Sequence, residues 1–312
     1  MASRPYVSFI TAAYDAASTI GETVDSVLGQ TRDDWEMIII DDGSVDETAA
    51  TAQSRSLRDD RVLVLRQSNA GTASARNAGA AHATGRFWCF LDADDTLQPG
   101  YVGAQAAFVA EHPGYDVYSC NAWLEPRSGR RRLMWQGSRY QHSLSLTLEE
   151  QLQESSILLM SLLTPRVFEL TGGFRDLHSE DYDFWLRAMV LGARHIYNPA
   201  ILAVYRRHAA SKTADMIAEA ESFLRIHEDV LEMPELSDTQ RELCSQVVAF
   251  DRARIERRRF ETAILSGDFR GARGAYLRNR EAYPDRLKYA LGLGLVMASP
   301  HLYGYVKKRR LV

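Results

Sequence analysis

The sequence predicts an α/β protein with a mostly parallel, Rossmann-like sheet flanked by helices, followed by a helical C-terminal appendage. Short apolar runs recur along the first hundred residues, and segments with helical periodicity separate them. Strand–helix alternation at this spacing is typical of doubly wound parallel sheets. Ligands of such sheets bind beyond the carboxyl ends of the strands, so we expect the functional residues there.

The predicted strands are apolar runs, each short enough to cross a sheet once. The fourth ends abruptly in acidic residues, and the last is interrupted by Pro199. The runs occupy residues 6–11, 35–40, 61–65, 87–91, 116–124 and 195–206.

The predicted helices carry apolar residues at helical spacing or, in one segment, mainly Ala, Ser and Gly. Ile20, Val24 and Val27 share a face of the first helix. Small residues in the third allow a close approach to the sheet. The helices are predicted at residues 18–28, from about 45, and at 72–83, 99–112, 147–163 (mostly helical) and 181–191.

Composition is that of an ordinary globular protein. The 312 residues are 46% hydrophobic and 25% charged, enough for one large domain with an appendage or for two domains. Cys89, Cys120 and Cys244 are far apart and odd in number, which indicates buried thiols in a reducing compartment. The N-terminus leads into a strand without an apolar leader, so we expect a cytoplasmic protein.

Helical stretches dominate from about residue 214, so we expect a first domain at 1–213 and a helical region at 214–312. Residues 251–312 carry fifteen Lys or Arg and six Asp or Glu, although the whole chain has a net charge of −4. A basic tail on an acidic body suggests an anionic partner or, alternatively, a solvated helical face.

The last part of this tail is apolar over residues 287–306 and ends in four basic residues at 307–310. Pro300 and three glycines interrupt it, so it does not read as a membrane-spanning helix. It fits a peripheral anchor on the anionic inner face of the plasma membrane. A terminal helix packed on the body is the alternative.

The most informative motif is the group Asp92, Asp94 and Asp95, directly after the fourth apolar run. Alternation along an extended backbone would point Asp92 and Asp94 to the same side. Adjacent carboxylates repel one another, and a cation would compensate. Oxygen ligands of this kind suit Mg²⁺ or Mn²⁺, which also bind phosphate oxygens. The alternative is an acidic loop that caps the next helix.

Further motifs follow in a specific order along residues 6–212, about two thirds of the chain. This order strongly resembles that of family 2 glycosyltransferases, which have the GT-A fold and invert the anomeric configuration. Two departures, Ala12 where the family often has Pro and Asp15 where Asn is usual, affect only the first loop. The motifs are Val7–Tyr14, Ser26–Thr31, Asp41–Asp46, Asn69–Gly71, Ala75–Asn77, Leu91–Asp95, Gly172–Phe174, Glu180–Arg187 and Tyr205–His208.

The resemblance implies a metal-dependent enzyme that moves a sugar from a nucleotide-diphosphate-sugar to a hydroxyl of a saccharide or lipid-linked saccharide, in bacterial cell-surface polysaccharide or glycoconjugate synthesis. Asp94 is the expected direct ligand of Mn²⁺ or Mg²⁺, and His208 completes the metal shell. Asp92 contacts the ribose or a water on the metal. The other residues expected at the nucleotide-sugar are Thr11, Tyr14, Asp41, Asn69, Arg76 and Arg206.

Inverting transfer needs a general base that deprotonates the acceptor hydroxyl. The resemblance puts that base at Asp181, at the start of a predicted helix. The acidic residues there would also be favourable charges at a helix N-terminus, and both roles are compatible. The residues expected on the acceptor side are Gly173, Phe174, Glu180 and Trp185.

Each alternative function would require or lack a particular sequence feature. Transfer to a polyprenyl phosphate would need no base, because that acceptor is already ionised. A non-catalytic nucleotide-sugar-binding protein would be expected to lack Asp94 or Asp181, and both are present. A nucleotidyltransferase would have a Gly-rich first loop, a dinucleotide dehydrogenase would have Gly-x-Gly-x-x-Gly, and a nucleic-acid-binding tail would interleave aromatic residues. The sequence has none of these features.

Overall fold

The computed structural model describes residues 4–126, 129–153, 157–207 and 216–278. It divides the chain into two compact units, Met1–Ser211 and Lys212–Val312. The first unit is a mixed α/β structure around one sheet, as the sequence predicted. The second unit is helical over its described residues.

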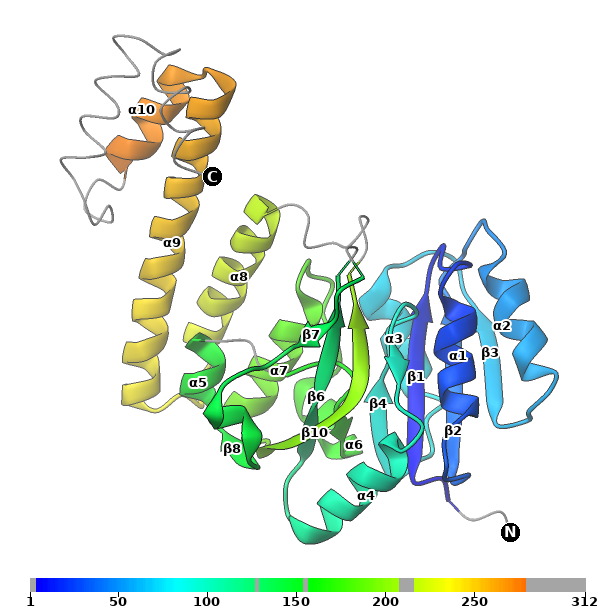
Figure 1. Cartoon of the computed structure of the whole chain (residues 1–312). Helices are drawn as coiled ribbons and strands as arrows, with labels where there is room; N and C mark the ends of the chain where they lie inside the picture. Colours follow the sequence, from blue (N-terminus) through cyan, green and yellow to red (C-terminus); the bar gives the residue numbers. More distant parts are fainter. Residues whose placement is uncertain (1–3, 127–128, 154–156, 208–215, 279–312) are drawn as a thin grey trace. The chain divides into compact units, whose positions relative to one another are not determined.

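The sheet of the first unit has the strand order β3-β2-β1-β4-β9-β6-β10-β5, with β7 beside β6 and β8 beside β10 (Figure 1). The pairs β3–β2, β2–β1, β1–β4 and β6–β10 are parallel. The strands are β1 Val7–Ala13, β2 Trp35–Asp41, β3 Val62–Arg66, β4 Phe87–Phe90, β5 Thr96–Leu97, β6 Val117–Glu125, β7 Arg132–Leu133, β8 Leu144–Leu146, β9 Leu162–Leu163 and β10 His195–Arg206.

Helices cover both faces of this sheet because the apolar residues of its strands alternate between two cores. Phe9 packs in one core with residues of α1, α2 and α4, whereas Ile10 packs in the other with α3, α6 and α7. These helices, with the short α5, are α1 Ile20–Leu28, α2 Thr48–Ser56, α3 Thr72–Ala80, α4 Tyr101–Glu111, α5 Leu148–Gln153, α6 Pro165–Thr171 and α7 Glu180–Val190.

One predicted helix was wrong. Over residues 147–163 only α5 is helical, and Leu162–Leu163 forms strand β9 instead. This strand lies antiparallel between β4 and β6 and pairs two residues with each. A short apolar run can be a buried strand or part of a helix, and periodicity alone does not separate the two.

The second unit contains α8 Met216–Leu231, α9 Asp238–Ser266 and α10 Phe269–Arg278. A buried contact of 2.6 Å between His227 Nδ1 and Asp251 Oδ2 joins α8 to α9. Among the described helices, none is both long and apolar enough to cross a membrane. The apolar and basic tail that the sequence predicted as an anchor lies outside the described residues.

Candidate active site

The candidate site is built from the loops that follow β1, β2 and β4, together with the first turn of α7 and the end of β10. The three strands are parallel neighbours, so their carboxyl ends lie at one edge of the sheet. Asp41 is the last residue of β2, and the group Asp92, Asp94 and Asp95 follows β4.

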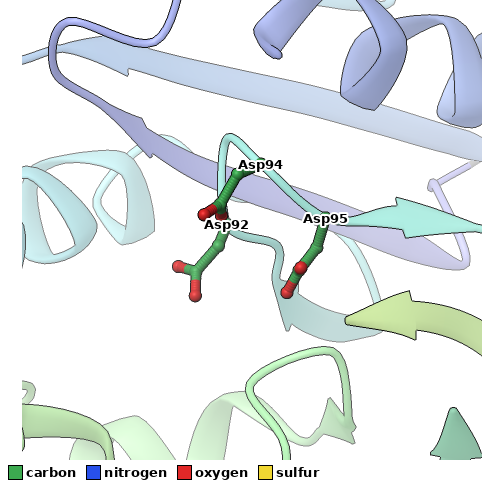
Figure 2. A group of neighbouring side chains, drawn as sticks. All are labelled: Asp92, Asp94 and Asp95. Carbon is green, nitrogen blue, oxygen red and sulfur yellow. The ribbon is translucent and has the colours of Figure 1, made fainter. Parts of the chain in front are cut away.

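The acidic loop, Leu91–Asp95, leads from β4 into β5. Figure 2 shows the carboxylates of Asp92, Asp94 and Asp95 projecting from this one loop, and one oxygen of each lies within 4.8 Å of the others. A hydrogen bond of 3.0 Å from Thr23 Oγ1 of α1 to the Ala93 carbonyl supports the loop. The loop is therefore held from the sheet and from α1.

Electrostatics within the acidic loop favours a bound cation. Asp95 is buried, and burial together with the charges of Asp92 and Asp94 raises its pKa well above the ordinary value. Its Oδ1 accepts a hydrogen bond from the Arg206 backbone, whereas Oδ2 is buried and has no hydrogen-bond partner among the described residues. Three crowded carboxylates with an unsatisfied oxygen are a donor set that fits a divalent metal ion.

Arg76 of α3 connects the acidic loop to α7. Its side chain is 4% exposed, with Nη2 donating to Asp92 Oδ1 at 2.6 Å and Nη1 to Glu180 Oε1 at 2.8 Å. Burial alone would lower the pKa of Arg76, but the charges of Asp92 and Glu180 raise it, so the guanidinium is charged. The small residues of α3 include Ala73 and Ala75, which pack on the sheet and bring Arg76 to this edge.

Asp181 lies in the first turn of α7, next to the buried Glu180. Burial and the charge of Glu180 raise the pKa of Asp181 to about 6, and Arg76 opposes that rise. Asp181 is thus mostly ionised at neutral pH and exchanges a proton in the range useful for general base catalysis. The charge of Asp92 in the acidic loop also raises the pKa of Asp181.

The two carboxylates at the end of β2 have different surroundings. Asp41 is buried, with Ser44 N donating to Oδ1 at 3.3 Å and Arg66 Nε 3.1 Å from Oδ2. Ser44 does not cap the next helix, because α2 begins only at Thr48. The sequence had assigned a role in the site to Asp41 only.

Asp42 holds the loop that precedes α3. Its Oδ1 accepts hydrogen bonds from Gln67 Nε2 at 2.7 Å and Ala70 N at 2.9 Å, and its Oδ2 accepts one from Gly71 N at 2.9 Å. Gly71 has φ = +88° at the start of α3, a backbone conformation that glycine adopts without a steric penalty. Asn69, on the same loop, is exposed.

At the end of β1, Tyr14 is 51% exposed, whereas Thr11 is buried and its hydroxyl has no hydrogen-bond partner in the described part of the chain. Asp15 Oδ1 accepts a hydrogen bond of 3.0 Å from Val45 N, and Asp15 N donates to Ser44 Oγ at 3.1 Å. These bonds fix the loop beneath Tyr14 and leave its ring accessible to a ligand.

Phe174 lies beneath Arg76, with the guanidinium carbon 5.2 Å from the ring centroid. Asn77 binds both the amide and the carbonyl of Phe174, each at 2.9 Å. Gly173 has φ = +89°, and a Cβ there would lie 2.7 Å from Asn77 Oδ1. Trp185 was expected on the acceptor side, but its side chain is fully buried in the core and offers no surface to an acceptor.

Strand β10 ends beside the acidic loop. Arg206 Nε donates to the Asp94 carbonyl, and Nη1 pairs with Glu22 at 2.5 Å, so this side chain braces the loop. Tyr205 was not predicted in the site, although burial and the charges of Asp95 and Asp92 raise its pKa. Tyr205 is the sequence neighbour of Arg206, which was predicted in the site, and this adjacency could have indicated it. His208 lies outside the described residues.

The model of the family described as glycosyl transferase family 2 matches residues 8–163. The chain is 41% identical over 109 residues to TuaG, a Bacillus subtilis glycosyltransferase named for teichuronic acid biosynthesis. That match covers 35% of this chain and 43% of TuaG, less than half of either protein. The chain belongs to glycosyl transferase family 2, a family of transferase enzymes.

A longer match is with the Escherichia coli protein WfaP, named as a UDP-Glc:α-D-GlcNAc-diphosphoundecaprenol β-1,3-glucosyltransferase. It is 28% identical over 214 residues, which cover 68% of this chain and 82% of WfaP.

Two solved structures share the fold. TarS (residues 1–349) of Staphylococcus aureus has a TM-score of 0.65 at 18% identity, covering 96% of this chain and 88% of the other. The mannosyltransferase PcManGT of Pyrobaculum calidifontis, solved with GDP-Man and Mn²⁺, has a TM-score of 0.64 at 18% identity, covering 96% and 82%. At these identities the likeness establishes the GT-A fold.

Proposed function

We propose that this protein is a metal-dependent inverting glycosyltransferase that moves a sugar from a nucleotide-diphosphate-sugar to a hydroxyl of a lipid-linked saccharide, in the synthesis of a bacterial cell-surface glycan. The observation that carries the proposal is the bridge made by Arg76. One guanidinium binds Asp92 of the acidic loop and Glu180, the neighbour of Asp181. A metal-binding cluster and a candidate base thus share one edge of the sheet.

The donor side comprises the loops after β1 and β2 and the acidic loop. The buried Asp41 would accept a hydrogen bond from the nucleobase, and the accessible ring of Tyr14 would stack on the base or ribose. Asp94 and Asp95 would hold Mn²⁺ or Mg²⁺, with Asp92 oriented by Arg76. When bound, the cation neutralises charge on the diphosphate leaving group as a Lewis acid.

On the acceptor side, Asp181 accepts the proton of the attacking hydroxyl as the oxygen approaches the anomeric carbon. Its pKa of about 6 leaves it ionised at neutral pH and makes it a stronger base than an ordinary carboxylate. Phe174 and the backbone of Gly173 lie next to this edge, and Arg187 fixes them by donating to the Gly173 carbonyl at 2.8 Å. The apolar ring of Phe174 would help to exclude water.

Two similarities support this choice of donor and acceptor. TarS has been solved with UDP-GlcNAc, and PcManGT with GDP-Man and Mn²⁺, so the fold accommodates nucleotide-sugars and a divalent ion in those proteins. WfaP is named for a diphosphoundecaprenol-linked acceptor. An acceptor of that type would bring the protein to the inner face of the membrane, where the basic tail could contact anionic lipid.

The test is nucleotide release from a panel of nucleotide-sugars, measured with Mn²⁺, Mg²⁺ or EDTA. We expect slow hydrolysis of one donor with metal and none with EDTA. If no donor turns over and metal adds no nucleotide affinity, the metal–diphosphate assignment fails, and the proposal fails with it.

The choice of acceptor is tested with the Asp181→Asn variant and the donor found above. Transfer to a sugar hydroxyl on a diphosphopolyprenol should be lost, because a hydroxyl needs a base. Transfer to a polyprenyl phosphate that survives in the variant would identify the alternative acceptor, since a phosphate is already ionised.

A further inference from the structure

A cavity lies at the edge of the sheet opposite to the acidic loop. Its volume is about 480 Å³, within the range of cavities that bind small molecules. Tyr6 precedes β1, Phe87 begins β4, and Tyr115 precedes β6, so the cavity is at the amino ends of strands that run in one direction. The acidic loop follows the carboxyl end of β4. The two sites are therefore separate.

Four aromatic side chains form a continuous row in this cavity. The ring centroids of Tyr6 and Phe87 lie 5.2 Å apart, those of Phe87 and Tyr118 5.9 Å, and those of Tyr118 and Tyr115 6.3 Å. Tyr118 is buried and its hydroxyl donates to the His112 carbonyl at 3.0 Å, which fixes the middle of the row. Tyr6 and Tyr115, at its ends, are half-buried.

Guanidinium groups lie over both ends of the row. The Arg86 carbon Cζ is 5.8 Å from the Tyr6 centroid and 5.3 Å from that of Phe87, and the Arg194 Cζ is 4.7 Å from that of Tyr115. Among the described residues, no carboxylate lies within ion-pair distance of the guanidinium of Arg86 or Arg194. These positive charges, held on aromatic faces, remain available to an anion.

Two acidic groups that act on the tyrosines of this cavity form ion pairs. Asp34 binds Arg32, another lining residue, and Asp116 binds Arg166 at 2.9 Å. Burial raises the pKa of Tyr6, whereas the charges of Arg86 and Arg32 lower it, in agreement with the positive potential at this end. The cavity thus combines aromatic walls with net positive charge.

We propose that this aromatic–guanidinium cavity binds a small aromatic anion, whose charged group pairs with Arg86 and whose ring packs against Tyr115 and Tyr118. Charge complementarity selects the anion, and the aromatic row selects a ring. A lipid surface fits less well, because a bilayer at this edge would place the acidic loop at the far end of the sheet. The ligand therefore acts away from the proposed sugar-transfer site.

The experiment uses the full chain in EDTA, which removes metal from the acidic loop and keeps the readout independent of activity. Phenyl phosphate, inorganic phosphate and benzyl alcohol are titrated by calorimetry. We expect phenyl phosphate to bind one per chain, at least about tenfold more tightly than either probe that lacks the ring or the charge. If phenyl phosphate shows no saturable binding, the proposal is overturned. If inorganic phosphate binds with equal affinity, the aromatic ring is not recognised and the proposal of an aromatic ligand is overturned.

Arg86→Ala should weaken phenyl phosphate binding at least about tenfold, because a charge-assisted contact is lost. Arg58→Ala removes an exposed arginine outside the cavity lining and should change nothing. Tyr115→Leu provides a second variant, which should weaken phenyl phosphate and leave inorganic phosphate unaffected. Unchanged phenyl phosphate binding in Arg86→Ala would exclude this cavity as the binding site and overturn the proposal. Pelleting with phosphatidylglycerol vesicles that Arg86→Ala abolishes, without phenyl phosphate binding, would assign the surface to lipid and overturn the proposal.

Discussion

Arg76 and Glu180 are 104 residues apart in the sequence and form a buried ion pair of 2.8 Å between α3 and α7. Each side chain is less than a tenth exposed. The pair ties the helix that follows the donor-side loops to the helix that carries Asp181. Its geometry therefore links the two halves of the proposed reaction.

Replacing Arg76 with Met should lower the free energy of unfolding by about 3–5 kcal/mol, because the buried Glu180 would lose the guanidinium with which it forms an ion pair. The double variant Arg76→Met/Glu180→Leu should recover part of that loss, since no buried charge is left at this contact. Chemical denaturation of the wild type, the single variants Arg76→Met and Glu180→Leu, and the double variant measures the coupling. Strictly additive losses would contradict a direct interaction.

Donor hydrolysis should depend on the ionisation of Asp181. Because the pKa of Asp181 is raised to about 6 and the ionised form is the base, activity should be constant above pH 7 and fall below pH 6. The decline should approach about tenfold per pH unit, as expected for a single ionisation. A pH–rate profile checks this. The Asp181→Asn variant should lose both the activity and the pH dependence, and a residual profile with the same midpoint would assign the ionisation to another group.

Asp94→Ala should reduce metal-dependent donor hydrolysis about 100-fold or more, because metal stabilisation of the leaving group amounts to several kcal/mol. The matched control is Asp60→Ala, which removes an exposed carboxylate in the loop before β3. Mn²⁺ titration followed by nucleotide affinity should show a metal effect in the control and none in Asp94→Ala. Equal behaviour of the two variants would argue against a metal at the acidic loop.

Asp42→Ala should destabilise the protein by about 3 kcal/mol, because it removes the acceptor of three part-buried hydrogen bonds from the 67–71 loop, each contributing about 1 kcal/mol. It should also raise the apparent KM for the donor, since the start of α3, and with it Arg76, loses its anchor. Thermal unfolding and donor kinetics together test this. A stability loss without any change in KM would limit Asp42 to a structural role.

The sequence was informative where a residue's role depends on its position after a strand. Asp92 and Asp94 were predicted as neighbours, and the structure brings them together in the acidic loop. Asp95 was not assigned to the site, because alternation along an extended backbone says nothing about a loop that turns after Phe90. Here the backbone folds back, with Asp95 N donating to the Asp92 carbonyl at 3.1 Å.

Sequence reasoning was weakest where tertiary packing decides the environment. The sequence pattern of α7 does not show that Trp185 is buried, because the helix is covered on nearly all sides from Tyr182 to Ala188 and has no exposed face with which to compare it. Leu162 and Leu163 form a strand by pairing with β4 on one side and β6 on the other, and these partners are distant in the sequence. The ion pair of Arg76 with Glu180 joins distant segments, so no local spacing predicts it.

The strand β9 has a mechanical consequence. It pairs only two residues with β4 and two with β6, so ladders as short as any in the sheet connect the strand that precedes the acidic loop to the half that contains β10. A force that separates the two halves of the sheet would therefore act mainly on the short ladders of β9. The buried Arg76–Glu180 ion pair gives an additional contact between α3 and α7. Amide hydrogen exchange should therefore be faster at Leu162 and Leu163 than in the seven-residue pairing of β1 with β2.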